Sequence, residues 1–196
     1  MANSKRKCGG CGSYFRPETK FPGPVAWCSF ECAMRISGKR KEAAQKRFQQ
    51  EERKEHRQAK ERVKTRSEWL KEAQAAVNAY VRERDKGNPC ISCGKPDDGS
   101  HQRHASHFKS TKACSVLRFH LHNIHASCAQ CNNQLSGNLL EYRRRLSAIK
   151  GPQYVEWLEC QNEPRRYGIS YLARLKLVFK RKLARLKALH NQHLGI

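Results

Sequence analysis

The fold is decided by residues 90–131, which read CISCGKPDDGSHQRHASHFKSTKACSVLRFHLHNIHASCAQC. The stretch begins with Cys90-x2-Cys93 and ends, after 34 intervening residues, with Cys128-x2-Cys131. Each pair brings two thiolates to one side of a tight turn, and four such sulfurs at ~2.3 Å are the ligands of a tetrahedral zinc ion. In a reducing compartment this spacing favours a metal site over disulfides. The alternatives are a redox-active pair or scattered buried thiols.

A second set of four cysteines lies near the N-terminus, with 16 residues between its two pairs: Cys8, Cys11, Cys28 and Cys32. Each zinc ion would supply folding free energy that a small domain cannot obtain from burial alone. Two structural zinc ions are therefore expected as cofactors. The remaining two of the ten cysteines, Cys114 and Cys160, are expected to be ordinary small residues.

The composition argues against one large hydrophobic core and for a polyanionic partner. The chain has 196 residues, 38% of them hydrophobic, and its mean hydropathy is −0.88. Forty Lys and Arg against 17 Asp and Glu give a formal net charge of +23, which favours nucleic acid as the partner. No apolar run approaches the ~18 residues of a membrane span. Because no apolar segment follows the opening MANSKRK, a cytoplasmic chain without membrane contact is expected.

Four segments are expected in an α+β protein built from small zinc-stabilised modules. Residues 1–37 form a treble-clef-like zinc module, in which Ser29 caps a short helix that carries Cys32. Residues 38–87 form a long basic helical segment that Gly87-Asn88-Pro89 ends. Residues 88–145 hold the second cysteine set, and residues 146–196 form a basic helical C-terminal region.

The central helical segment changes character along its length. From Lys39 to Arg66 it has 12 basic and 5 acidic residues and neither Gly nor Pro, a pattern typical of a solvated helix, a spacer or a basic face on DNA. Apolar residues then recur at helical spacing from Leu70 through Val77 to Tyr80. Such a face packs either on the neighbouring zinc module or on a second protomer as a coiled coil.

The last helix is expected to be apolar on one side and basic on the other. Ser170 is expected to cap it, and its apolar side comprises Leu172, Leu175, Phe179, Leu183 and Leu186. Its basic residues are expected to contact DNA phosphates: Arg174, Lys180, Arg181, Lys182 and Arg185. The alternative is an amphipathic helix on a membrane surface.

Six histidines lie between the halves of the second cysteine set. The first pair of cysteines is expected to lead into a strand that ends near His107, and the second strand to carry Asn123. A helix is expected to start around Cys131 and to run toward Leu140, with Asn132 in its first turn. The alternative is a basic loop that faces DNA without any chemistry.

A hydrolytic site in this unit would need a base, a divalent ion and a group that orients the base. His107 is the candidate base, because imidazole titrates near neutral pH. His104 and Asn132 are candidate ligands of a catalytic divalent ion, and the side-chain carbonyl of Asn123 is a candidate partner of the His107 ring. His125 is a secondary candidate, with packing or a phosphate contact as the alternative.

Longer strings carry a family resemblance: WCSFEC (27–32), QAAVNAYVRERDKGNPCISCG (74–94), LRFHLHNIHASCAQCN (117–132) and SGNLLEYR (136–143). The chain resembles the NinG/Rap recombination nucleases of lambdoid phages, whose nuclease core is of the HNH or ββα-metal class. The resemblance covers most of residues 5–145 and weakens in the C-terminal helix. It implies a structure-specific DNA endonuclease that cuts branched recombination intermediates, D-loops and Holliday junctions, in the cytoplasm of a bacterial host.

The resemblance also bears on metal, partners and oligomeric state. Where the family usually has Asp-Ala-Gly-His, this chain has HASH at residues 104–107. The resemblance implies a catalytic Mg²⁺ or Mn²⁺, but an uncharged imidazole at His104 would hold Mg²⁺ less well and would favour Mn²⁺, Zn²⁺ or Ni²⁺. Symmetric cutting of two strands needs two active sites, so a homodimer is expected, with other recombination proteins as further partners. The rival hypothesis is a non-catalytic, zinc-stabilised protein that binds branched or single-stranded DNA.

Overall fold

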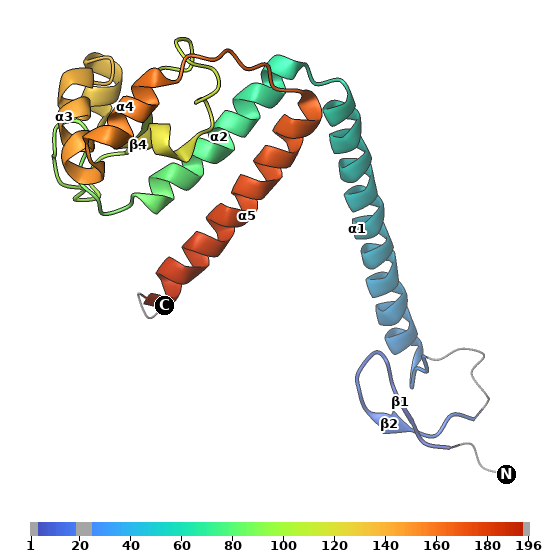
Figure 1. The fold of residues 1–196 in the computed structure, drawn as a ribbon. Coiled ribbons are helices and arrows are strands. Elements are labelled where there is room, and N and C mark those ends of the chain that lie inside the picture. Colours follow the sequence, from blue (N-terminus) through green and yellow to red (C-terminus); the bar gives the residue numbers. More distant parts are fainter. Residues whose placement is uncertain (1–3, 19–24, 194–196) are drawn as a thin grey trace. The chain divides into compact units, whose positions relative to one another are not determined.

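The computed structural model describes residues 4–18 and 25–193, and the chain is α+β (Figure 1). It divides into two compact units, Met1–Val63 and Lys64–Ile196. Among the described residues, no helix is both long and apolar enough to cross a bilayer.

The first unit is a small hairpin followed by one long helix. Strands β1 (Arg6–Lys7) and β2 (Tyr14–Phe15) pair antiparallel, and helix α1 spans Phe30–Arg62. The side chain of Ser29 accepts a hydrogen bond from the backbone N–H of Cys32 at 3.3 Å, which confirms the predicted cap and holds the first turn of α1 beside the hairpin.

Most of α1 has no core to pack against. Every residue from 37 to the end of the helix is exposed, over a length of ~50 Å for the 33 residues of α1. The predicted helical segment 38–87 is helical but is not one helix, because the chain leaves α1 at Val63 and begins a new helix after Thr65. Thr65 and Glu68 form a reciprocal capping box, a start signal that the sequence contains as Ser/Thr-x-x-Glu.

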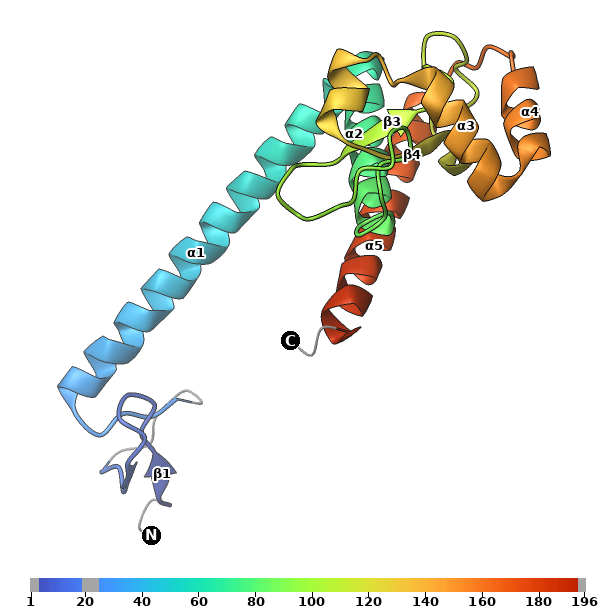
Figure 2. The same ribbon diagram turned by 90° about the vertical axis from the view of Figure 1, so that its left-hand side faces the viewer.

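The second unit is organised around two long helices that lie side by side, α2 (Arg66–Arg84) and α5 (Ile169–His193) (Figures 1 and 2). Their apolar faces form one core with three residues from outside the two helices, Phe119, Ile124 and Tyr167. The helices contribute Trp69, Ala73, Ala76, Val77, Val81, Leu172 and Phe179. The face of α2 is therefore covered within the chain, by α5 and the strands. Helix α5 begins at Ile169, so Ser170 lies inside its first turn and does not cap it.

A small antiparallel sheet packs against α2. Strand β3 (His104–His107) pairs with β4 (Ile124–Ser127), and the 3₁₀ turn η1 (Leu121–Asn123) precedes β4. The first strand ends at His107 as predicted, but Asn123 lies just before the second strand.

The expected single helix from Cys131 toward Leu140 is also wrong. A short π-helical turn η2 (Gln130–Gln134) is followed by residues with positive φ, at Ser136, Gly137 and Asn138, which no right-handed helix can include. Helices α3 (Leu139–Lys150) and α4 (Pro152–Cys160) then follow. They enclose a second core: Ile91, Phe108, Cys114, Leu117, Tyr142, Leu146, Val155 and Leu158.

Candidate functional site

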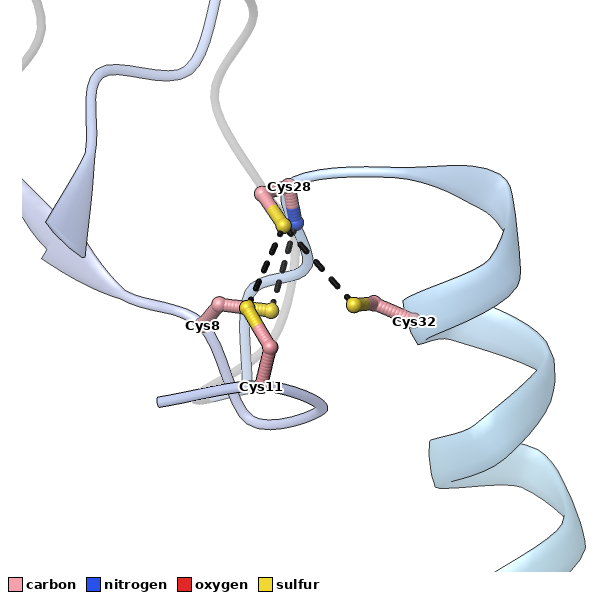
Figure 3. Close-up of side chains that lie close together, drawn as sticks. All are labelled: Cys8, Cys11, Cys28 and Cys32. Atoms are coloured by element: carbon pink, nitrogen blue, oxygen red, sulfur yellow. Dashed lines mark hydrogen bonds between the residues drawn. The ribbon is translucent and has the colours of Figure 1, made fainter. Parts of the chain in front are cut away.

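The first cysteine set converges on one point, as Figure 3 shows. The sulfurs of Cys11 and Cys28 lie 3.5 Å apart, and those of Cys28 and Cys32 lie 3.7 Å apart. A Cβ on Gly10 would lie 2.6 Å from the Cβ of Cys32, so only glycine lets the turn approach α1 this closely.

The four cysteines of the second set also converge on one point, within the second unit. The sulfurs of Cys93 and Cys128 lie 3.8 Å apart, and the ligand atoms of all four cysteines lie within 4.8 Å of one another. The N–H of Cys128 donates to the sulfur of Cys90 at 3.2 Å, which fixes the start of η2 on the first pair. Cys131 is buried in η2 itself.

The thiols have the electrostatics of a site for a cation. Backbone N–H groups, that of Cys11 first, hold the pKa of Cys8 at about 6. Hydrogen bonding among the sulfurs, that to Cys11 first, raises the pKa of Cys28 to about 12. One thiolate thus forms readily while a neighbour resists ionisation, and a divalent cation would relieve this conflict. The two sets could each hold a structural zinc ion, whereas Cys114 and Cys160 belong to neither set.

His107 is half-buried at the end of β3. Its Nε2 lies 3.0 Å from the carbonyl oxygen of Arg118, and because a carbonyl only accepts, Nε2 carries the proton and Nδ1 carries the lone pair. Burial lowers the pKa of His107, so the neutral ring predominates at pH 7. Within the described residues, Nδ1 of His107 has no hydrogen-bond partner.

Asn123 holds the loop after His107 and makes no hydrogen bond with the His107 ring. Its fully buried side chain accepts from the N–H of Lys109 at 2.7 Å and donates to the carbonyls of Lys109 at 2.9 Å and Leu117 at 3.3 Å. The expected contact between Asn123 and the ring is therefore wrong. The backbone of Arg118 makes that contact, and a backbone carbonyl leaves no signal in sequence.

His104 lies on β3 and Asn132 on η2, and among the described residues no hydrogen bond joins their side chains. His104 is three residues before His107 on β3, and strand alternation places the two side chains on opposite faces. The side chain of Asn132 donates to that of Asn133 at 2.8 Å. Outside the two cysteine sets, the part of the chain that the structure describes has no group of three or more His, Cys, Asp and Glu ligand atoms close enough to share an ion.

His125 has a fixed tautomer and a pKa lowered to about 4, first by burial and then by the cation of Arg84. The hydroxyl of Tyr142 donates to the carbonyl of Ser106 at 3.2 Å, so it accepts from Nδ1 of His125 at 2.9 Å. The other ring nitrogen, Nε2, therefore carries a lone pair, and His125 lines a cavity of about 660 Å³. Tyr142 is a residue that the sequence argument missed.

Two residues at the end of α2, Arg84 and Asp85, bind the backbone around β4, and neither was predicted from the sequence. Arg84 donates to the carbonyls of Leu121 at 3.3 Å and Ile124 at 2.8 Å, while it pairs with Asp85 at 2.6 Å. Asp85 accepts from the N–H of Ala126 at 2.9 Å. Adjacent opposite charges at a helix end were the available signal.

Basic side chains remain exposed on both long terminal helices. All five predicted DNA contacts on α5 are exposed, although Lys182 also lies 5.4 Å from the ring of Phe179. On α1, basic residues recur every seven residues at Lys39, Lys46, Arg53 and Lys60. Seven residues are nearly two turns, so these four lie along one face of the exposed helix.

The comparisons with known proteins agree over nearly the whole chain. A profile of the family described as Bacteriophage Lambda NinG protein matches residues 1–191. Protein ninG of Escherichia phage lambda is 36% identical over 203 aligned residues, 94% of each chain. Protein ninG of Salmonella phage P22 is 35% identical over 207, covering 95% of this chain and 97% of that protein.

A shorter match covers only part of the chain. Protein ninG of Escherichia phage 933W is 41% identical over 125 residues, 64% of this chain and 61% of that protein. No solved structure matches significantly. The family profile extends through α5 to residue 191, further than the resemblance read from the strings before residue 145. The chain therefore belongs to the bacteriophage lambda NinG protein family.

Proposed function

We propose that this protein is a metal-dependent endonuclease that hydrolyses phosphodiester bonds in branched DNA. The chemistry needs a proton acceptor for the attacking water and cationic stabilisation of the phosphate. Two cysteine sets, each able to hold a structural zinc ion, would stabilise the small units that carry these groups. Symmetric cutting of a junction would bring two copies of the chain together.

The observation that carries the proposal is the state of the His107 ring. Its Nε2 proton is committed to the carbonyl of Arg118, so the proton of an attacking water would move to the unpartnered Nδ1. A base of this kind must be neutral before the reaction, and the lowered pKa of His107 meets that requirement at pH 7. Asn123 supports the geometry indirectly, because it fixes the loop on which Arg118 lies.

A divalent cation, when bound, would neutralise the charge that develops on the phosphate. His104 and Asn132 are the side chains of this chain proposed to hold it, although strand alternation puts His104 on the face of β3 opposite His107. His125, which pairs with Ser106, shares the face of His104 and offers Nε2 as a further lone pair. Since His104 is an uncharged ligand, we expect Mn²⁺ or Ni²⁺ to support more activity than Mg²⁺ at equal concentration.

DNA binding would rest on charge more than on base contacts. The net charge is +23, and the basic faces of α1 and α5 are solvent-exposed. Contacts of Lys and Arg with phosphates position a protein on DNA without specifying sequence, which suits a substrate defined by its branched shape.

The test is cleavage of a four-way junction and of a linear duplex with each divalent ion added in turn. We expect the junction to be nicked by the parent protein and by His101→Ala, an exposed histidine of the same segment. His107→Ala and His107→Asn should bind the junction and leave it intact. Cutting by both His107 variants at the parent rate would remove His107 from the mechanism.

A second candidate is a non-catalytic protein that binds branched or single-stranded DNA. It is favoured by one observation: outside the cysteine sets, the described residues hold no further close group of His, Cys, Asp and Glu ligands. Tight binding of the junction by the parent protein with no cutting under any divalent ion would establish this candidate in place of the endonuclease.

A further inference from the structure

Four aromatic rings gather at the surface where η1 meets α4. His120 and His122 come from the turn before β4, and Tyr154 and Trp157 come from α4. The rings of His122 and Tyr154 are stacked with centroids 5.1 Å apart, and His120 lies 5.0 Å from His122 and 5.2 Å from Trp157. We call these four residues the ring cluster.

The ring cluster is open to solvent on one side. Trp157 is 42% exposed, and the four rings alone line a hollow of about 300 Å³. His122 and Tyr154 also line the larger cavity of about 660 Å³, with Lys150 and Arg84 among its other walls. The cluster therefore presents ring faces to its own hollow and borders a larger cavity that Arg84 and Lys150 also line.

The composition of the ring cluster is unlike that of the neighbouring core. The core beneath it is aliphatic and aromatic, whereas the cluster uses two imidazoles. Nδ1 of His120 is buried and has no hydrogen-bond partner among the described atoms, an arrangement that packing alone does not favour. Burial, followed by the charge of His122, lowers the pKa of His120, so this ring stacks as a neutral aromatic at pH 7.

We propose that the ring cluster binds an unpaired base of a DNA strand. Imidazole, indole and phenol rings are the side chains on which unpaired bases stack in proteins. Bases inside a duplex have both faces covered, so only an unpaired base can use an exposed ring. The net charge of +23 makes a polyanion the complementary partner, and the adjoining cavity, which Lys150 lines, supplies a cation on the side of His122 and Tyr154.

The position of the ring cluster connects it to the proposed endonuclease, on which this inference rests. His120 is two residues beyond Arg118, whose carbonyl accepts from the His107 ring. Two nearby residues of one loop therefore have different roles. Arg118 contacts the proposed base, and His120 belongs to the ring cluster. If the ring cluster holds an unpaired base, the DNA next to His107 is a strand at a branch point and not a continuous duplex.

The experiment compares binding of oligothymidylate and of a duplex of equal length, with no divalent metal added and at fixed salt. Trp157→Leu should weaken binding of oligothymidylate by roughly five- to a hundredfold and leave duplex binding unchanged. Trp157→Phe, which keeps an aromatic ring, should retain most of the affinity for oligothymidylate. Phe48→Leu is the matched control, because Phe48 is an exposed aromatic on α1, 66% accessible. Quenching of tryptophan emission by oligothymidylate should disappear in Trp157→Leu.

Several outcomes would overturn the inference. Equal binding of oligothymidylate by Trp157→Leu and the parent would do so, as would equal losses for oligothymidylate and duplex. Tighter binding of oligouridylate than oligothymidylate would reassign the cluster to RNA. The proposed endonuclease fails separately: a parent protein that binds oligothymidylate through Trp157 but cuts no junction would keep the ring cluster and lose the enzyme.

Discussion

Replacing Asn123 by alanine should destabilise the second unit and, through it, reduce any cleavage. The Asn123 side chain is fully buried and makes three hydrogen bonds to the backbone of Lys109 and Leu117. Alanine would leave the N–H of Lys109 without its acceptor, and a buried group left unsatisfied costs about 1–3 kcal/mol. With two carbonyls also losing their donor, we expect a total loss of roughly 2–4 kcal/mol.

The measurement is thermal unfolding of the zinc-loaded protein, followed by circular dichroism. For a unit of the size of Lys64–Ile196, each kcal/mol lowers the midpoint by about 3–5 °C, so Asn123→Ala should melt on the order of 6–20 °C lower. Asn123→Asp keeps the acceptor for Lys109 but turns an anion toward two carbonyls, and it should melt lower still. Asn133→Ala, at an exposed amide of η2, should change the midpoint by less than about 2 °C.

The reasoning would be refuted by Asn123→Ala that melts with the parent protein. If that variant also lost cleavage, Asn123 would act on the His107 ring or on the substrate directly, and the loop-holding role would be wrong. A loss of cleavage that follows the loss of stability, and that is recovered at low temperature, is the expected result.

Charge and the cysteine sets give further predictions. The pKa of His125 is lowered to about 4 in the folded protein, so on acidification the unfolded chain binds a proton at this residue first. The free energy of unfolding should therefore fall by on the order of 3 kcal/mol between pH 6.5 and 4. The variant His125→Asn should lack this fall when unfolding is measured across the same pH range. Cys8→Ser should lower the zinc content from two ions to one by metal analysis while the second unit stays folded, whereas Cys90→Ser should unfold that unit. Lys46→Gln should make the log–log salt dependence of DNA binding shallower by about 0.9, and Lys41→Gln, on the other face of α1, should change it less.

Features with local causes were the ones that the sequence could predict. Both cysteine sets follow from ligand spacing, and the cap at Ser29 and the strand end at His107 follow from neighbouring residues. The break at Thr65 was also local, since its partner Glu68 is three residues away, and it was missed because the charge pattern runs on without interruption.

Features with distant causes could not be predicted. The face of α2 is covered by α5, about a hundred residues later, and Lys176 of α5 contacts Glu72 of α2 at 2.7 Å. The partner of the His107 ring is a backbone carbonyl, which any residue type would provide. Whether Asn123 points at a ring or at a loop depends on where that loop closes, and no spacing rule encodes this.

The exposure of α1 has a consequence for how its length can evolve. A helix that buries no side chain beyond residue 36 has no core to disrupt when residues are gained or lost. Inserting seven residues would lengthen it by ~10 Å and rotate the rest of the helix only slightly, whereas inserting two would turn the downstream charges to another side. Natural insertions and deletions in this helix should therefore come in multiples of seven residues. Such changes alter the length of α1 while they keep the direction in which its downstream charges point.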